Sequence, residues 1–201
     1  RHGGVAQRAK WAAQRHLLPR LRTCETSRNA ALVAAEACLV SRNQGLYNSL
    51  RLLDNELTQY TDVLHEYFLP PEDLAGFLAA ARKELRAHDA QLLSASVRSV
   101  ERSETLLSYA PEHRLSVVLY VSQRVTPAGH ADMADLTRRL VALALERGGS
   151  FYLPYQQHYS RADVQRGYPD IDAFFALKAE RDPGRLFMNS LAHRYDTTLP
   201  Q

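Results

Sequence analysis

A β-strand is predicted by the sequence Asp62-Val-Leu-His-Glu-Tyr-Phe-Leu69, which is short, rich in strand-favouring residues and followed by Pro70-Pro71. Pro71 is expected to open a helix, because Glu72 and Asp73 are favourable near the positive end of a helix dipole. Apolar residues then recur at helical spacing as far as Leu85. The hydrophobic period therefore changes at the two prolines, and a strand followed by a helix is predicted.

The downstream sequence continues this alternation of strands and helices. Two strands are predicted at 92–100 and 115–122, and a helix at 130–147 is ended by Gly148-Gly149. An edge strand is predicted at 150–155, because Pro154 cannot donate a hydrogen bond within a central ladder. The order β-α-β-β-α-β from 61 to 155 is typical of the split-βαβ, ferredoxin-like arrangement. We therefore expect an α+β fold with a four-stranded antiparallel sheet and both helices on one face.

The other face of this sheet is predicted to be polar. In the strand at 92–100, alternation places Leu93, Ala95, Val97 and Ser99 on one side and Leu92, Ser94, Ser96 and Arg98 on the other. The strand at 115–122 divides into Leu115, Val117, Leu119 and Val121 and, opposite them, Ser116, Val118, Tyr120 and Ser122. Short hydrogen-bonding groups around one cation suit a polar ligand or a second domain. A solvated face is the alternative.

Two further regions flank the predicted core at 61–155. Residues 1–60 form a predicted helical segment, with helices at 5–18 and 26–42 and a polar connector at 43–60. Residues 156–201 form a predicted tail, which starts with the capping-box sequence Ser160-Arg-Ala-Asp163. A helix through 171–178 and a turn at Asp182-Pro183-Gly184 follow.

The composition is that of a globular protein. The 201 residues are 45% hydrophobic and 23% charged, with a formal net charge of +3. No apolar run approaches the roughly 20 residues of a membrane span, and we expect a cytoplasmic protein that is at most peripheral to a membrane. Basic residues are scattered after the first 24, so a nucleic-acid partner is not expected. Cys24 and Cys38 lack metal-ligand spacing and are interpreted as small apolar fillers in a reducing compartment.

The beginning of the sequence is unusual. The first residue is Arg1 rather than Met, and six basic residues but no acidic one precede Cys24. We expect an excised or processed chain. The basic run matches either a targeting or anion-binding segment or, as the favoured alternative, the basic face of structural helices.

A resemblance to a known family emerges from the C-terminal half. The motifs that carry it are Gly148-Gly-Ser-Phe-Tyr-Leu-Pro-Tyr155, Gly167-Tyr-Pro-Asp-Ile-Asp-Ala-Phe-Phe-Ala-Leu-Lys178, Asp182-Pro-Gly-Arg-Leu-Phe-Met-Asn189 and Glu66-Tyr-Phe-Leu-Pro70. The first three follow one another as in the C-terminal part of FAD-linked oxidases of the vanillyl-alcohol oxidase type, which they resemble, and Glu66–Pro70 resembles the start of the substrate domain in the lactone oxidases. The aldonolactone and alditol oxidases and the decaprenylphosphoryl-ribose oxidases have the most similar patterns.

The resemblance implies a substrate-binding cap domain that covers the flavin of a separate FAD-binding domain. No Gly-rich phosphate-binding segment is found here, so the chain would be a fragment of an oxidoreductase that is inactive alone. Its partners would be its own FAD-binding domain and a small polar, sugar-like substrate whose alcohol carbon transfers hydride to FAD. A homodimer is also compatible. The alternative is a free-standing ferredoxin-like binding or dimerisation module without flavin.

The resemblance also implies roles for individual residues. Ser96 and Arg98 occupy the positions of a Glu-x-Arg motif, and Tyr120 and Ser122 those of a His-x-Thr motif. Tyr155 stands where the lactone oxidases have Lys, so it would donate a hydrogen bond but supplies no charge.

These positions define a candidate site. Arg98, Tyr155 and Tyr120 are the expected catalytic residues, Ser96, Ser122 and Gln157 the expected substrate-binding residues, and Tyr152 and Asn189 the expected contacts to the cofactor. An ion pair for Arg98 and plain packing for the tyrosines are the alternatives. No metal site is expected. The substrate, the electron acceptor, the mode of flavin attachment and the oligomeric state are not indicated by the sequence.

Overall fold

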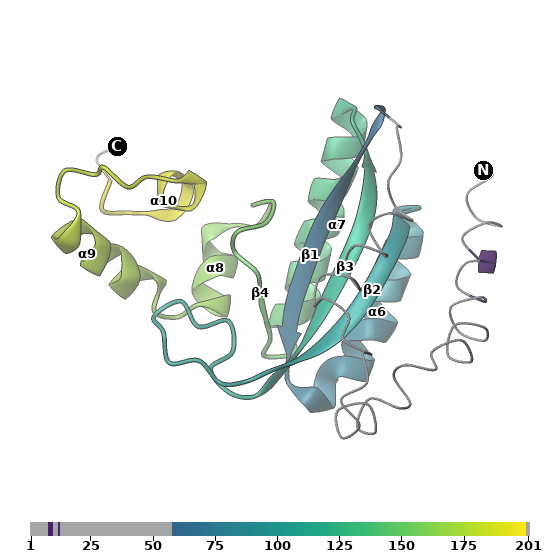
Figure 1. Ribbon diagram of the computed structural model, residues 1–201, viewed down its shortest axis with the longest axis horizontal. Helices are drawn as coiled ribbons and strands as arrows, with labels where there is room; N and C mark the ends of the chain where they lie inside the picture. The colour runs from purple at the N-terminus through teal and green to yellow at the C-terminus, as the bar shows by residue number, and fades with distance from the viewer. Residues whose placement is uncertain (1–7, 10–11, 13–57, 200–201) are drawn as a thin grey trace, which may run out of the picture. The chain divides into compact units, whose positions relative to one another are not determined.

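The computed structural model describes residues 8, 9, 12 and 58–199. Residues 8, 9 and 12 are helical, and the rest of the predicted helices at 5–18 and 26–42 lies outside the described residues, as do Cys24 and Cys38. The sheet region comprises β1 (Tyr60–Leu69), the 3-10 turn η1 (Pro71–Asp73), α6 (Leu74–Ala87), β2 (Gln91–Val100), β3 (Arg114–Arg124), α7 (Pro127–Leu145) and β4 (Ser150–Phe151). The tail comprises α8 (Arg161–Gly167), α9 (Ile171–Arg181) and α10 (Ser190–Tyr195) (Figure 1).

The four strands form one antiparallel sheet in the order β2-β3-β1-β4. β3 pairs with β1 over the whole length of β1, from Tyr60↔Arg124 to Leu69↔Leu115, and with β2 on its other side. The long helices α6 and α7 lie together behind the sheet (Figure 1). The predicted α+β class with a four-stranded antiparallel sheet is therefore confirmed, whereas the ferredoxin-like description stays a prediction.

The hydrophobic core lies between this sheet and the two helices. Alternate β1 residues from Val63 to Leu69 face it, and Leu136 and Leu140 of α7 are fully buried there. Each such side chain contributes about 1.5–3 kcal/mol of transfer free energy. The same cluster includes Tyr168 of the tail, whose hydroxyl donates to the carbonyl of Phe151. The tail is therefore packed into the core of the sheet region.

Helix α7 begins earlier than predicted. Thr126 is its N-cap and accepts a hydrogen bond from the backbone N–H of Gly129 at 3.0 Å, and Pro127 occupies the first helical turn. Both residues are typical helix-start signals, so the predicted start at 130 is wrong by about one turn. The predicted glycine stop is confirmed. Gly149 donates to the carbonyl of Ala144 and Gly148, at φ 63°, donates to that of Leu145, which together form a Schellman motif.

A β-bulge corrects the predicted faces of β2. The register shifts between Leu92 and Ser94, so Leu92 pairs with Val121 and packs against the core. Its predicted place beside Ser94 on the polar side is wrong, because the extra residue reverses the alternation. From Ser94 onward the predicted faces agree with the register.

β4 is shorter than the predicted strand at 150–155. Only Phe151 and Ser150 pair with β1, and Tyr152 adds one bond from its N–H to the carbonyl of Glu66 at 3.0 Å. A longer ladder is disfavoured because Pro154 lacks an N–H group. The chain leaves the sheet here and continues towards the tail.

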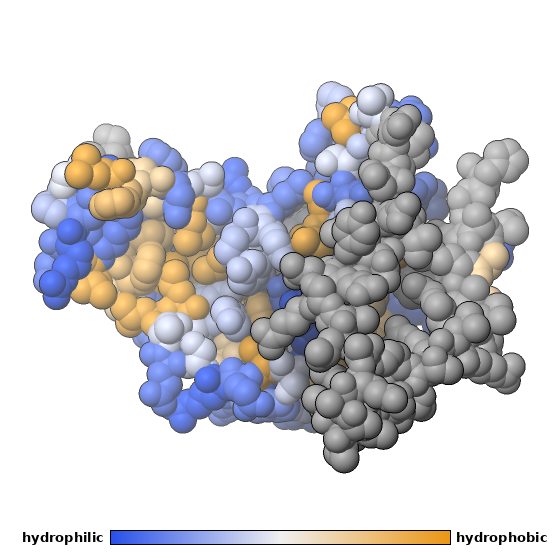
Figure 2. Space-filling view, in the orientation of Figure 1, coloured by the Kyte–Doolittle hydropathy of each residue, from blue (hydrophilic) through white to orange (hydrophobic). Residues whose placement is uncertain are grey.

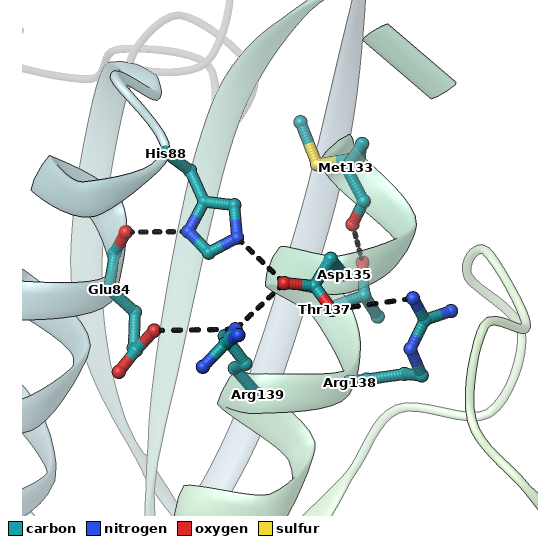
Figure 3. A network of polar contacts seen from close by, with 7 residues as sticks. All are labelled: Glu84, His88, Met133, Asp135, Thr137, Arg138 and Arg139. Atoms are coloured by element: carbon teal, nitrogen blue, oxygen red, sulfur yellow. Dashed lines mark hydrogen bonds and ion pairs between the residues drawn. The ribbon is translucent and has the colours of Figure 1, made fainter. Parts of the chain in front are cut away.

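A polar network joins α6 to α7 (Figure 3). His88 Nδ1 lies 2.9 Å from the carbonyl of Glu84, and its Nε2 lies 3.1 Å from Asp135 Oδ2, which also accepts from Arg139 Nε at 2.7 Å. Burial alone lowers the pKa of His88, but these hydrogen bonds and the charges of Asp132 and Asp135 outweigh it and raise the pKa. Hydrogen bonds, first from Arg139 and then from His88, lower the pKa of Asp135 to about 2.

Candidate functional site

The candidate site is built on the sheet face opposite α6 and α7, which we call the polar sheet face. The strand register assigns to it Asp62, Leu64, Glu66 and Phe68 of β1, Ser94, Ser96 and Arg98 of β2, and Ser116, Val118, Tyr120 and Ser122 of β3. Phe68, Ser116 and Arg98 form one row across the three strands, and Glu66, Val118 and Ser96 form the next. The polarity predicted for β2 and β3 extends to β1 through its two carboxylates.

Glu66 lies at the centre of this face. Its Oε1 accepts a hydrogen bond from the hydroxyl of the fully buried Ser116 at 2.5 Å. A hydroxyl that donates to a carboxylate orients it and strengthens the bond through the charge. The second carboxylate oxygen is left to receive a hydrogen bond or a proton from a bound molecule.

Arg98 lies on the same face in the adjacent row, two strands away from Glu66 with β3 between them. Its side chain is exposed and forms no ion pair with any carboxylate of the described residues. The ion-pair alternative is therefore not observed in the part of the chain that the structure describes. An exposed and unpaired guanidinium retains its donors for an oxygen-bearing ligand.

Tyr155 approaches Glu66 and Arg98 from the segment that follows β4. Burial, the negative charge of Glu66 and the neighbouring Tyr152 raise the pKa of the Tyr155 hydroxyl, while the charge of Arg98 opposes them. The hydroxyl is therefore protonated at neutral pH and acts as a hydrogen-bond donor. Arg98 and Tyr155, both predicted from the sequence as catalytic, are brought into the same electrostatic neighbourhood.

An aromatic cluster borders the polar group. Phe68 and Tyr109 stack with ring centroids 4.5 Å apart, and Tyr152 makes edge contacts with Phe68, with Tyr109 at 6.3 Å and with Tyr155 at 4.8 Å. Such edge-to-face pairs have a preferred geometry that holds each ring in place. Tyr152, expected from the sequence to contact a cofactor, thus packs edge-on against the ring of Tyr155.

Tyr120 and Ser122 belong to a different part of the same face. The hydroxyl of Tyr120 donates to Asp62 Oδ2 at 3.1 Å, and Ser122 pairs with Asp62 across the ladder. Burial, this hydrogen bond and the charge of Asp62 raise the pKa of Tyr120. Asp62 and Glu66 are separated by four strand residues, or about 13 Å. The structure therefore does not bring Tyr120 and Ser122 together with Arg98.

Gln157 and Asn189 lie in a groove that Tyr155 also lines. The groove has a volume of about 830 Å³ and is formed by the segment 153–157 and by α10 with its N-cap. Asn189 is that N-cap, and its Oδ1 accepts from the N–H of Ala192 at 2.9 Å. Helix α10 was not predicted, although Asn-Ser before an apolar pair is a recognisable capping signal.

Sequence reasoning missed the two carboxylates of the face, Asp62 and Glu66. The signal was present, because residues 62, 64, 66 and 68 alternate with the buried residues of the same predicted strand. His65, the neighbour of Glu66, points to the core, where it is 5% exposed, and burial followed by the charge of His158 lowers its pKa to about 4. The two side chains lie on opposite faces, as the alternation predicts.

The comparisons with known proteins do not identify a family for this chain. A comparison of the chain with protein-family models finds no matching family, and a comparison with curated proteins finds no significant match. In residues 58–199 and the three described N-terminal positions, no group of three potential metal ligands is found. Across the same residues, no helix has both the length and the apolar character needed to span a membrane. The resemblance to FAD-linked oxidases therefore stays a hypothesis.

Proposed function

We propose that this chain is the substrate-binding part of an FAD-dependent oxidoreductase that oxidises an alcohol carbon of a polar substrate, with the FAD-binding domain elsewhere in the protein. The observation that carries the proposal is that a protonated Tyr155 lies within the electrostatic reach of both the hydrogen-bonded Glu66 carboxylate and an exposed Arg98 that has no ion pair among the described residues. Two donors and one acceptor at the edge of an aromatic cluster suit a hydroxylated ligand.

Different residues would perform different steps of alcohol oxidation. The reaction removes a proton from the hydroxyl oxygen and a hydride from the carbon, and leaves a carbonyl group. FAD, when bound, supplies the hydride acceptor. Glu66 would take the hydroxyl proton, held in orientation by Ser116. Arg98 and Tyr155 would donate hydrogen bonds to the substrate oxygen and hold it during the loss of the proton.

The residues predicted to contact the cofactor fit a flavin ring in part. Asn189 uses its carbonyl oxygen internally as the helix cap, so its amide N–H groups are left to donate to the acceptor atoms of a flavin. Tyr152 is packed among Phe68, Tyr109 and Tyr155 and has the role of a support. Phosphate binding would fall to the proposed FAD-binding domain.

Kinetic measurements on the intact gene product test this proposal. The protein should purify with bound flavin, and Arg98→Ala should slow flavin reduction by substrate at least about tenfold, the equivalent of one lost charged hydrogen bond, while the FAD content is unchanged. Arg102→Ala is the matched control, because Arg102 lies beyond β2 and pairs with Glu104 at the surface. A colourless gene product, or equal loss of FAD and rate in Arg98→Ala, would contradict the proposal.

Two further variants separate the roles of Glu66 and Tyr155. Glu66→Gln keeps the acceptor for Ser116 but removes the base, so the rate of flavin reduction should fall while the fold is retained. Tyr155→Phe should weaken turnover with the fold intact, because only one hydroxyl is lost. An unchanged reductive half-reaction in either variant would remove that residue from the mechanism.

The second candidate function, a binding or dimerisation module without flavin, is favoured by one observation. β2 is an outer strand of the sheet, and its residue Val97 is 50% exposed. Exposed apolar residues on an edge strand are typical of surfaces that pair with another chain. A colourless protein that sediments as a dimer, and becomes monomeric in Val97→Lys, would support this function in place of the oxidoreductase.

A further inference from the structure

We propose that the groove between the segment 153–157 and α10 binds the carboxylate or phosphate group of a small molecule. This inference requires no flavin, and it assigns the Asn189 amide to the anion in place of a flavin. The groove adjoins the Arg98 and Glu66 group through Tyr155, which lines it. The volume of about 830 Å³ lies within the range of small-molecule sites. The chemistry of its wall identifies the class of ligand.

The groove is lined by hydrogen-bond donors whose acceptor atoms are already used. Asn189 Oδ1 accepts from Ala192, and Gln156 Oε1 lies 3.0 Å from His158 Nε2, which must donate because an amide oxygen accepts only. The side-chain NH₂ groups of Asn189 and Gln156 take no part in these two hydrogen bonds and can donate to a ligand. The backbone carbonyl of Gln157 is used by Arg194. A wall with spare donors and occupied acceptors favours an anionic ligand.

The charged residue types of the groove also favour an anionic ligand. Among the residues that the structure describes, its lining includes His193 and Arg194 and no Asp or Glu. Arg194 forms no ion pair with any carboxylate in the described part of the chain, and its bond from Nη1 to Gln157 holds the guanidinium at the rim. Arg194 also forms a hydrogen bond with the Tyr195 side chain, and its guanidinium has five N–H groups, so further donors are left for a ligand.

Further positive charges act on His158, the residue that follows the groove segment 153–157. Burial first, then the charges of Arg138, Arg194 and His130, lower the pKa of His158. Three cationic or potentially cationic groups therefore act on one position beside the groove. Arg138 is partly compensated by Asp135 on its own helix, whereas Arg194 is not compensated by a described acidic residue. Arg194 is therefore the expected main contact of the anion.

The apolar residues of the lining indicate the form of the ligand. Leu153, Pro154 and Leu191 line the same groove, and Figure 2 shows further apolar surface on the tail, where Leu186 and Phe187 are 83% and 78% exposed. Asp182 fixes this tail loop by accepting from the N–H groups of both residues. The ligand expected is therefore a small organic acid or phosphate ester with an uncharged body, rather than a bare inorganic ion alone.

Titrations of the full 201-residue chain test the inference, with inorganic phosphate, hexanoate and hexyl phosphate as probes followed by ¹⁵N NMR. We expect saturable shifts of the side-chain amides of Gln156 and Asn189 and of the Arg194 Nε–H. Phosphate and hexyl phosphate against hexanoate distinguish a phosphate from a carboxylate preference. The alkyl probes should bind more tightly than inorganic phosphate, because they also cover the apolar wall. Shifts with none of the three probes would overturn the inference.

Variants then assign the site. Arg194→Ala should weaken binding at least about tenfold, whereas Arg102→Ala, with the same change in net charge, should alter it less than about twofold. Because Arg194→Ala also removes the bond to Gln157, Gln156→Glu is the second variant. It keeps an acceptor for His158 and puts a negative charge in the groove, so it should abolish binding while the rest of the spectrum is unchanged. Undiminished binding in Gln156→Glu would show that the anion lies elsewhere and refute the site.

Discussion

Gly149→Ala is expected to destabilise the protein through a steric conflict between α7 and β1. A Cβ atom at this position would lie 2.6 Å from the carbonyl oxygen of Phe68 and 2.9 Å from that of Ala144. Both contacts are shorter than the 3.0 Å below which real Cβ contacts essentially do not occur. Because both oxygens belong to the backbone, β1 and the end of α7 must separate.

Overpacking of this kind costs about 1–3 kcal/mol. The upper half of that range applies here, because two backbone atoms must move and Phe68 lies in the two-residue pairing of β1 with β4. For a chain of this size, 1 kcal/mol shifts the melting temperature by about 2–4 °C. Gly149→Ala should therefore lower the melting temperature by about 4–12 °C in a calorimetric scan.

Gly148→Ala is the matched control, because it tests a different mechanism at the adjacent residue. No atom lies within 4 Å of the Cβ that Ala would add, but φ is 63°, in the left-handed region. The cost is that of the backbone conformation alone, about 1 kcal/mol. Gly148→Asn should lose less, because Asn tolerates this conformation. If Gly149→Ala melts at or above the temperature of Gly148→Ala, the steric argument is wrong.

Three other predictions concern the core, a helix cap and the network between α6 and α7. Leu140→Ala should lower the free energy of unfolding by about 2–5 kcal/mol in urea titrations, because Leu140 is fully buried; a loss below about 1 kcal/mol would contradict the packing. Thr126→Ala should cost about 1 kcal/mol and Thr126→Ser much less, since serine keeps the cap to Gly129; equal losses would contradict the cap. His88→Gln should destabilise the protein mainly under acidic conditions. Because the folded pKa of His88 is raised, its contribution is fully present below the unfolded pKa of about 6.5 and is lost as the pH rises through the folded pKa. Asp135 stays ionised down to about pH 2, so the stability difference between wild type and His88→Gln should be larger at about pH 5.5 than at about pH 8.5, and an equal difference would contradict this.

The elements that the sequence predicted well are those with a strong local signal. β1, β2, β3 and α9 lie within a few residues of their expected places, since each combines a clear period with Pro, Gly or capping residues at its ends. The capping box at Ser160 and Asp163 is confirmed in both directions. The start of α7 was placed at 130 because the apolar stripe begins at Met133, although Thr126-Pro127 is itself a start signal.

The errors at β2 and β4 arise from pairing, which has no local signal. Leu92 faces the core because the ladder between β2 and β3 contains a bulge, and this depends on residues of both strands. β4 ends at Phe151 because its partner is β1, and the following residues instead pack as an aromatic cluster. In both cases the strand-forming residues were identified, and the number of residues that pair was not.

The candidate site shows the same division. Arg98 and Tyr155 were identified from their motifs, but Glu66 was not, because its importance lies in its proximity to Tyr155 and Ser116. Tyr120 and Ser122 were predicted in one site with Arg98, and the register separates them from it by about 13 Å and about 20 Å along β3. The distance between two residues of one strand follows from their sequence numbers. Which strands pair, and therefore which side chains of different strands lie close together, does not.

The sequence by itself determined the α+β class and the polarity of one sheet face, because hydrophobic period and helix-ending residues act over a few neighbouring positions. The tertiary structure alone decided that Glu66 meets Tyr155, that Arg194 is left without an acidic partner among the described residues, and that α10 closes one side of a groove. These features depend on contacts between residues far apart in the chain. Such contacts follow from how the helices and strands pack together, and no local pattern records them.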